Sequence, residues 1–297
     1  MVESMKLGGR ACTHEVHQYI PNSPTPVAHT LETWVSTTPS ASEDKKYWII
    51  YIHGGAWWRP MITASSFSLT VQHLLSSSNS EPHIAGCASI NYRLSTPPPL
   101  PQFAQFVEPN NPARNVKHPA HLDDVVAAIK YLQKTYGFAE SYILAGHSCG
   151  ATLAFQIPNE VGLAPPDGIL GVEGIYDLAK LRNDHKDIPM YQYFTESAFG
   201  NNEAVWNLAS PTTQRNKSGH VWEKAKIVAL AQSDEDELVD VSQKEIMWEK
   251  ILGSPVEGRK DFTMQLTGKH DEIWREGETD TQLKVAFEQV LKLLMAG

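Results

Sequence analysis

Ser148 stands at the centre of the sequence GHSCG, a pattern that can present a serine as a nucleophile. A strand-like run, SYILA, precedes the pattern, and a helix-like run, GATLAFQI, follows it. On a sharp strand-to-helix turn, side chains at the flanking positions would collide with the strand and the helix, and Gly146 and Gly150 avoid this. The helix would direct its N-terminus at the serine, and the backbone N–H of Cys149 could point toward an oxyanion. The pattern therefore predicts a nucleophilic serine at position 148.

A serine hydroxyl needs a base, most often a histidine held by a carboxylate. In sheets that carry such a turn, the chain order is nucleophile, acid, base. His270 follows the last strand-like run, FTMQL, and is the only histidine after His220, so we predict that it is the base. The acid should follow the preceding run, KIVALA, where the segment QSDEDELV offers several carboxylates. We favour Asp236, which heads the DELV run, and keep Asp234 as the alternative.

The segment HGGAWW follows another strand-like run, YWIIYI. A loop with few side chains can bring its backbone N–H groups against a carbonyl oxygen, and each such donor typically contributes about 2.7–4 kcal/mol to transition-state stabilisation. We expect Gly54, Gly55 and Ala56 to form an oxyanion hole together with Cys149. His53, at the start of the loop, is expected to brace it by hydrogen bonding.

The elements that must position these residues follow from the hydrophobic pattern. Helix-like stretches alternate with strand-like runs at 47–52, 84–91, 141–145, 169–176, 226–231 and 262–266. This alternation is typical of an α/β fold with a mostly parallel central sheet and helices on both faces. Apolar residues recur every three or four positions over 120–137 and 283–294, which predicts two helices with one buried face. Ligands bind beyond the carboxyl ends of parallel strands, where the loops named above lie.

No composition break or repeat divides the chain, so we predict a single domain over residues 1–297. Residues 1–45 form an N-terminal arm in this prediction. Residues 95–119 are rich in proline, cannot be sheet or long helix, and are expected to be an excursion over one end of the sheet.

The composition limits the classes of partner. The formal net charge is −9, and no cluster of Lys and Arg exceeds a pair, which argues against nucleic acid. No apolar run approaches the roughly 20 residues that span a bilayer, the first residues contain no secretory signal, and three scattered cysteines form no disulfide framework. We therefore expect a cytoplasmic protein with no membrane association and a small-molecule substrate. The sequence does not set the oligomeric state and leaves a homodimer open.

The motifs HGGAW, NYRLS, GHSCG and DELV, with a late Gly-Lys-His-Asp, resemble the α/β-hydrolase superfamily from about Tyr47 to the C-terminus. The likeness is to the branch shared by hormone-sensitive-lipase-like esterases and kynurenine formamidases. Those esterases usually have a third glycine at the position of Ala56, and a Trp after HGGA is more similar to the formamidases. The run EGIYDL, residues 173–178, also resembles the fungal kynurenine formamidases (arylformamidases).

The resemblance implies a Ser148–Asp236–His270 triad that cleaves N-formyl-L-kynurenine to L-kynurenine and formate, a step of tryptophan degradation toward NAD. The alternative is a carboxylesterase for small acyl esters. No metal-binding spacing such as HExxH occurs, so we expect neither a metal nor a cofactor.

Aromatic residues near these motifs are the candidate substrate contacts. Trp57 and Trp58 could crowd the acyl side, stack on the aryl ring, or fill the core of their own loop. Tyr176 and Phe194 are further candidates, and each could instead simply fill the hydrophobic core. The residues that would hold the amino-acid zwitterion are not identified by the sequence.

Overall fold

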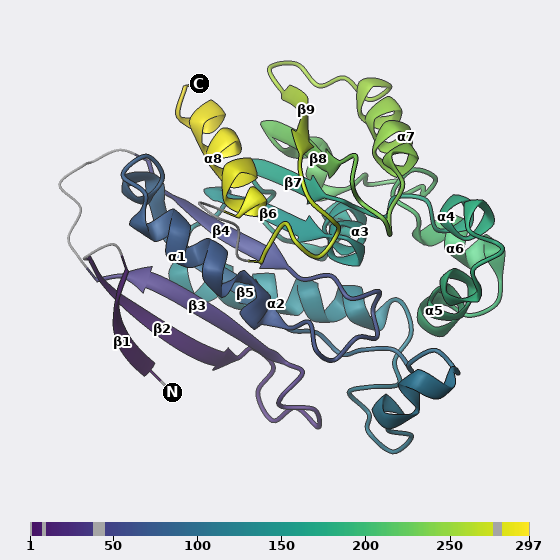
Figure 1. Ribbon diagram of the computed structural model, residues 1–297. Helices are drawn as coiled ribbons and strands as arrows, with labels where there is room; N and C mark the ends of the chain where they lie inside the picture. The colour runs from purple at the N-terminus through teal and green to yellow at the C-terminus, as the bar shows by residue number, and fades with distance from the viewer. Residues whose placement is uncertain (1, 8–9, 38–44, 276–280, 297) are drawn as a thin grey trace.

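One nine-stranded sheet forms the centre of the molecule (Figure 1). The computed structural model describes residues 2–7, 10–37, 45–275 and 281–296. The strand order is β1-β2-β3-β5-β4-β6-β7-β8-β9. The strands are β1 (Val2–Leu7), β2 (Arg10–Gln18), β3 (Thr30–Ser36), β4 (Tyr47–Ile52), β5 (Ile84–Ile90), β6 (Tyr142–His147), β7 (Gly168–Val172), β8 (Ile227–Ser233) and β9 (Lys260–Leu266).

The six strands from β4 to β9 pair in parallel. Strands β1, β2 and β3 pair antiparallel, and β3 joins this group to the parallel part of the sheet by pairing antiparallel with β5. The prediction of a mostly parallel sheet is therefore confirmed. Every side chain of β4, β6 and β8 is buried, as expected for central strands covered on both faces.

Helices cover both faces of the sheet. Helices α1 (Ser68–Ser76) and α8 (Gln282–Met295) pack on one face, and α2 (Ala120–Tyr136), α3 (Cys149–Gln156) and α7 (Val241–Leu252) pack on the other. Three short helices, α4 (Leu178–Asp184), α5 (Pro189–Phe199) and α6 (Glu203–Ala209), gather at one end of the sheet (Figure 1). Short 3-10 helices lie at Ala64–Phe67, Glu81–His83, Pro101–Phe106, Asn159–Val161 and Val221–Lys224.

Several elements differ from the sequence prediction. The strand expected over 169–176 ends at Val172, because Glu173 adopts a left-handed conformation with φ +48° and turns the chain out of the sheet. About half of the N-terminal arm consists of β1, β2 and β3, whose mixed polar sequences gave no strand signal. The proline-rich excursion contains only the 3-10 helix Pro101–Phe106. In the described part of the chain, no helix is both long and apolar enough to cross a bilayer.

Candidate active site

Ser148 lies on a sharp turn between β6 and α3. Its backbone has φ 55° and ψ −124°, a conformation that L-residues rarely adopt. The turn is tight on both sides: a Cβ on Gly146 would lie 2.2 Å from the Gly150 carbonyl oxygen, and a Cβ on Gly150 would lie 2.2 Å from the Ile52 carbonyl oxygen. The backbone N–H of Ser148 donates to the Val172 carbonyl at 2.9 Å and fixes the turn to β7.

His270 lies in the loop after β9 and is 3% exposed. Its Nδ1 lies 2.9 Å from Asp236 Oδ2. The other Asp236 oxygen accepts hydrogen bonds from the backbone N–H groups of Leu238 and Val239, each at 2.9 Å. Asp234 is exposed at the start of the same turn. Of the two acids that the sequence left open, the structure brings Asp236 to His270.

The glycine loop packs against the nucleophile turn. A Cβ on Gly54 would lie 2.9 Å from His147 Nδ1 and 3.1 Å from Ser148 Cβ. Positive φ angles of 102° at Gly55 and 48° at Ala56 bend the loop over the turn. The structure thus brings this loop to the serine, as the oxyanion-hole hypothesis requires.

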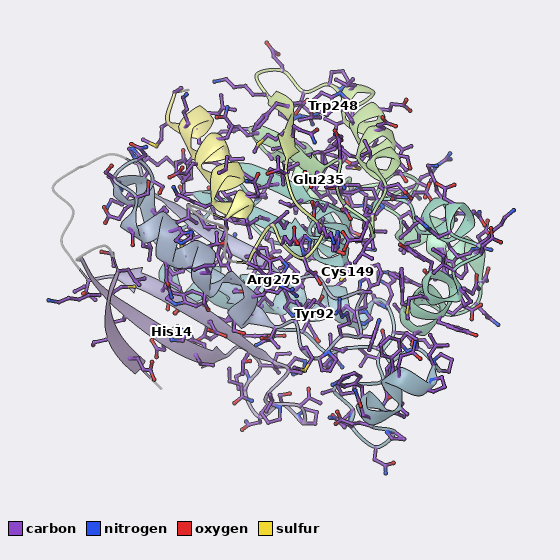
Figure 2. The ribbon with its side chains drawn as sticks, viewed as in Figure 1. His14, Tyr92, Cys149, Glu235, Trp248 and Arg275 are labelled. Carbon is purple, nitrogen blue, oxygen red and sulfur yellow. The ribbon has the colours of Figure 1, made fainter. Side chains whose placement is uncertain are left out.

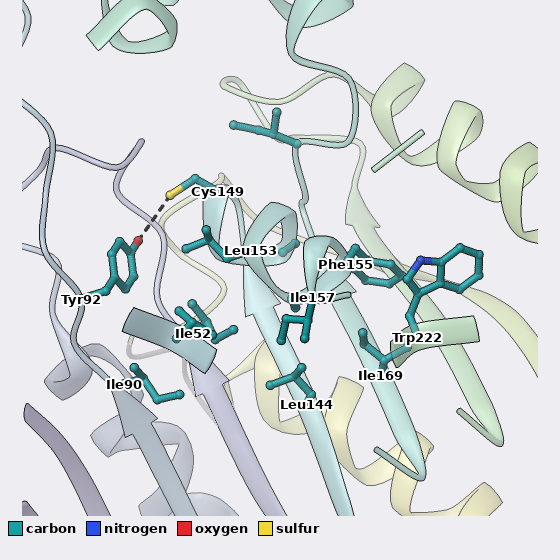
Figure 3. Packing of buried hydrophobic residues seen from close by; sticks show 14 of the residues in the cluster. Ile52, Ile90, Tyr92, Leu144, Cys149, Leu153, Phe155, Ile157, Ile169 and Trp222 are labelled. Atoms are coloured by element: carbon teal, nitrogen blue, oxygen red, sulfur yellow. Dashed lines mark hydrogen bonds between the residues drawn. The ribbon is translucent and has the colours of Figure 1, made fainter. Parts of the chain in front are cut away.

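Cys149 and Tyr92 hold the glycine loop in place through hydrogen bonds to its backbone. The Cys149 thiol accepts a hydrogen bond from the Trp57 N–H at 3.4 Å, and the Tyr92 hydroxyl donates to the His53 carbonyl at 3.0 Å. The Tyr92 hydroxyl and Cys149 Sγ are also in contact, 3.6 Å apart (Figure 3). His53 stacks on the Tyr92 ring, and its Nδ1 lies 2.8 Å from the Gly54 carbonyl. Tyr92, from the NYRLS segment, is a supporting residue that the sequence motifs did not predict.

Ser148 and His270 line one cavity of about 340 Å³ together with Gly55 and Ala56. Its remaining wall is mostly apolar and comes from the glycine loop, the proline-rich excursion, the loop after β7, helices α4 and α5, and the acid turn. These residues are Trp58, Phe103, Ile175, Leu181, Ile188, Met190, Tyr191, Phe194, Leu238 and Val239. The charged residues of the lining are Arg59, Glu237 and Asp271, and Arg59 pairs with Asp271 at 3.3 Å.

The candidate substrate contacts divide into two groups. Trp58 and Phe194 line the cavity. Trp57 is fully buried behind it and packs edge-on against Phe199, with ring centroids 5.0 Å apart. Tyr176 is likewise buried and packs against Phe155. The structure therefore places neither Trp57 nor Tyr176 on the cavity. The left-handed turn at 56–57 directs Trp57 into the core, and the Tyr176 hydroxyl occupies the space that a Cβ on Gly171 would fill.

Comparison with known proteins identifies the family. The chain is 38% identical over 270 residues to a kynurenine formamidase-like hydrolase, fscH, of Fusarium equiseti, covering 87% of this chain and 89% of the relative. It is 35% identical over 288 residues to the kynurenine formamidase avaC of Aspergillus versicolor, covering 90% and 96%. The chain belongs to the kynurenine formamidase family. No protein-family model matches the sequence.

Solved structures show the same fold for this family member. Esterase B of Lactobacillus rhamnosis superposes with a TM-score of 0.67 at 14% identity, covering 96% of this chain and 86% of the esterase. A hormone-sensitive lipase from a metagenome library superposes with a TM-score of 0.61 at 19% identity, covering 100% and 85%. The fold is that of the α/β-hydrolases, as predicted.

This kynurenine formamidase family member also buries a second carboxyl beside the base. Glu173 follows β7 directly; its Oε2 lies 3.4 Å from His270 Nδ1 and 3.4 Å from His147 Nε2. Burial, and then the charge of Asp236, raise the pKa of Glu173 to about 10. Burial, with the charge of His270, lowers the pKa of His147 well below its ordinary value. Glu173 was not among the predicted site residues because it lies inside an apolar run; the available signal was a charged residue in the middle of a predicted strand that is otherwise apolar.

The ligating atoms of His147, Glu173 and His270 all lie within 4.8 Å of one another, so by type and spacing these residues could hold a metal ion. However, His270 Nδ1 already binds Asp236, which leaves that nitrogen unavailable to a metal ion, and His147 and Glu173 are fully buried. We therefore interpret the cluster as the buried support of the base. Figure 2 labels Cys149 and Tyr92 near the middle of the molecule and His14 on the outer strands.

Proposed function

We propose that this protein hydrolyses N-formyl-L-kynurenine to L-kynurenine and formate, with Ser148 as nucleophile, His270 as base and Asp236 as the orienting acid. The observation that carries the proposal is the shared cavity: Ser148 and His270 open onto one apolar space while Asp236 binds the far nitrogen of the base. Family membership supplies the substrate class, since the Aspergillus versicolor relative is named a kynurenine formamidase.

The reaction is acyl transfer in two steps. Ser148 Oγ attacks the formyl carbon while His270 takes its proton, and the C–N bond then breaks as His270 returns the proton to the aryl amine. Water, deprotonated by His270, attacks the formyl-serine ester and releases formate. Backbone N–H groups of Gly54, Gly55, Ala56 and Cys149 are the proposed donors to the oxyanion of both tetrahedral intermediates.

The cavity has properties suited to such a substrate. Its volume of about 340 Å³ falls within the usual range of small-molecule sites. The formyl group carries only a hydrogen, so the acyl side needs little room, while Trp58 and Phe194 offer aromatic faces for the aryl ring. Arg59, Glu237 and Asp271 are the charged lining residues that we propose to meet the amino-acid zwitterion.

The whole chain is proposed to act as one domain, since strands from β1 to β9 share one sheet and the site takes residues from loops throughout it. We also propose a cytoplasmic location, for which the three free, buried cysteines are the support.

The test is a steady-state comparison of N-formylkynurenine with p-nitrophenyl acetate and p-nitrophenyl butyrate. We expect a much higher kcat/KM for N-formylkynurenine, and equal or better turnover of the butyrate ester would overturn the formamidase assignment in favour of a carboxylesterase. Ser148→Ala and His270→Ala should each abolish nearly all turnover with an unchanged circular dichroism spectrum.

A further inference from the structure

Two carboxyl groups approach the same nitrogen of His270. Asp236 Oδ2 is 2.9 Å from Nδ1, and Glu173 Oε2 is 3.4 Å from it. Asp236 is well supplied with donors, since the Gln232 side-chain amide binds one oxygen at 2.8 Å and two backbone N–H groups bind the other. Neither oxygen of Glu173 accepts a hydrogen bond of good geometry from the described residues, and the backbone of Ser233 is the one nearby group that favours its charged form. The two carboxyls thus face the same nitrogen, Asp236 with several hydrogen-bond donors around it and Glu173 with almost none.

Glu173 is held in this position at an energetic cost. Its side chain is fully buried, and its backbone lies in the left-handed region at φ +48°, which typically costs about 1–3 kcal/mol for a residue other than glycine. The backbone N–H of Glu173 donates to the Ala231 carbonyl at 2.8 Å, which anchors this turn to β8, the strand that carries Asp236 at its end. Such strain persists only where the surroundings enforce it, and it clusters at functional sites.

We propose that Glu173 is a second positioning carboxyl for His270: it is protonated while Asp236 binds Nδ1, and it accepts the Nδ1–H hydrogen bond itself when the charge of Asp236 is removed. The proposal rests on the assignment of His270 as the base. It explains why a carboxyl is buried against two histidines with so little to stabilise its charge, in contrast to the three donors of Asp236.

The charges around Glu173 give the proposal a defined direction. The groups that face it are His147, His270, Asp236, Glu237 and Asp271. Burial raises the pKa of Glu173 most, and the negative charge of Asp236 raises it further. Replacing Asp236 by alanine removes that second cause, so the pKa of Glu173 falls, although burial still holds it above the usual range for a glutamic acid.

The experiment measures the rate at which a fluorophosphonate labels Ser148. In this reaction Ser148 Oγ attacks phosphorus, fluoride leaves, and His270 takes the proton, so the rate reports on the base and does not depend on the formamide substrate. Loss of N-formylkynurenine hydrolysis with intact labelling would therefore count against the proposed substrate alone. Ser148→Ala lacks the nucleophile and measures the background labelling.

We expect Glu173→Gln alone to slow labelling much less than Asp236→Ala does, because the amide replaces a neutral acid of the same shape; a loss as large as that of Asp236→Ala would show that the Glu173 anion is needed even beside Asp236 and would overturn the proposal. In the Asp236→Ala background, Glu173→Gln should slow labelling by at least about tenfold. Glu235→Gln in the same background is the matched control, since Glu235 is an exposed carboxylate next to Asp236, and it should change little. Equal rates for Asp236→Ala and Asp236→Ala/Glu173→Gln would overturn the proposal.

A pH profile separates positioning from a merely structural role. The labelling rate of Asp236→Ala should rise with pH as Glu173 ionises. This rise should occur at a higher pH than in the unsubstituted protein, and the added substitution Glu173→Gln should remove it. A rise that survives Glu173→Gln contradicts the proposal.

Asp236 also caps its own turn, so Asp236→Ala could fail to fold. Infrared difference spectroscopy of the unsubstituted protein against Glu173→Gln then decides the matter, since both keep Asp236. We expect the carbonyl stretch of a protonated carboxylic acid at neutral pH, lost in Glu173→Gln. Its absence would show that Glu173 is ionised and would overturn the proposal.

Discussion

Gly146 and Gly150 lie so close together across the nucleophile turn that a Cβ on Gly146 would stand 2.2 Å from the Gly150 carbonyl oxygen. The contact arises because β6 runs directly into α3 through Ser148, so that the end of the strand packs against the first turn of the helix. The close approach of these two backbone segments sets the position of Ser148. It leaves no room for a side chain at position 146 or 150.

Gly150→Ala should destabilise the fold strongly and abolish hydrolysis. Its Cβ would lie 2.2 Å from the Ile52 carbonyl oxygen and 2.6 Å from that of His53, and backbone of central strand β4 cannot move aside cheaply. We expect a loss of about 3 kcal/mol or more in the free energy of unfolding, measured by urea denaturation. Gly162→Ala is the control, because a Cβ there meets nothing within 4 Å and its φ of 74° should cost only about 1–2 kcal/mol. Similar losses at the two sites would show that the close approach is not the cause.

The central elements were predictable because each has a strong local pattern. In β4, six consecutive apolar side chains are all buried, and α2 carries its apolar stripe at helical spacing. The loops that hold Ser148, Asp236 and His270 followed from the rule that sites lie beyond the carboxyl ends of parallel strands.

Other features depend on contacts that leave no local trace. Strand β2, RACTHEVHQ, is held by pairing on both edges and has no apolar run. Trp58 lines the cavity and the adjacent Trp57 does not, a difference set by positive φ angles at Ala56 and Trp57, which neither residue type favours. Glu173 is buried by tertiary packing, and its polar type within an apolar strand end was the remaining sign of a special role.

Asp236→Asn should lower kcat on N-formylkynurenine by up to about 10⁴-fold, because its amide, unlike the alanine of Asp236→Ala, still occupies the place beside His270 Nδ1, keeps Glu173 from it and favours the wrong tautomer of His270. Asp234→Asn, which changes the same charge two residues away at an exposed position, is the matched control and should retain nearly full activity. Steady-state kinetics on both variants measures the difference. An inactive Asp234 variant beside an active Asp236 variant would reverse the assignment of the acid.

Trp58→Ala and Trp57→Ala should fail in different ways. Trp58 lines the cavity beside Phe103, with ring centroids 4.6 Å apart, so its loss should raise KM while the fold remains. Trp57 is buried in the core, so Trp57→Ala should lower the free energy of unfolding by about 3–5 kcal/mol. Thermal unfolding and steady-state kinetics on both variants make the comparison, and a Trp58 variant with unchanged KM would remove Trp58 from the substrate contacts.

The free energy of unfolding should decrease as the pH is lowered from about 6.5, in part because of His121. Its ring is fully buried, and burial, with the charges of His118 and Arg93, lowers the pKa of His121 to about 3. Between that value and the ordinary pKa near 6.5, the unfolded chain binds a proton that the folded protein does not, so acidification favours unfolding by up to about 1.4 kcal/mol per pH unit. His121→Gln removes the proton site and should give a shallower decline between pH 6 and pH 4 in urea-unfolding measurements. Ser95→Ala, which deletes the hydroxyl 2.9 Å from His121 Nε2 but keeps the imidazole, should retain the full slope; equal slopes for His121→Gln and the unsubstituted protein would assign the acid sensitivity to other groups.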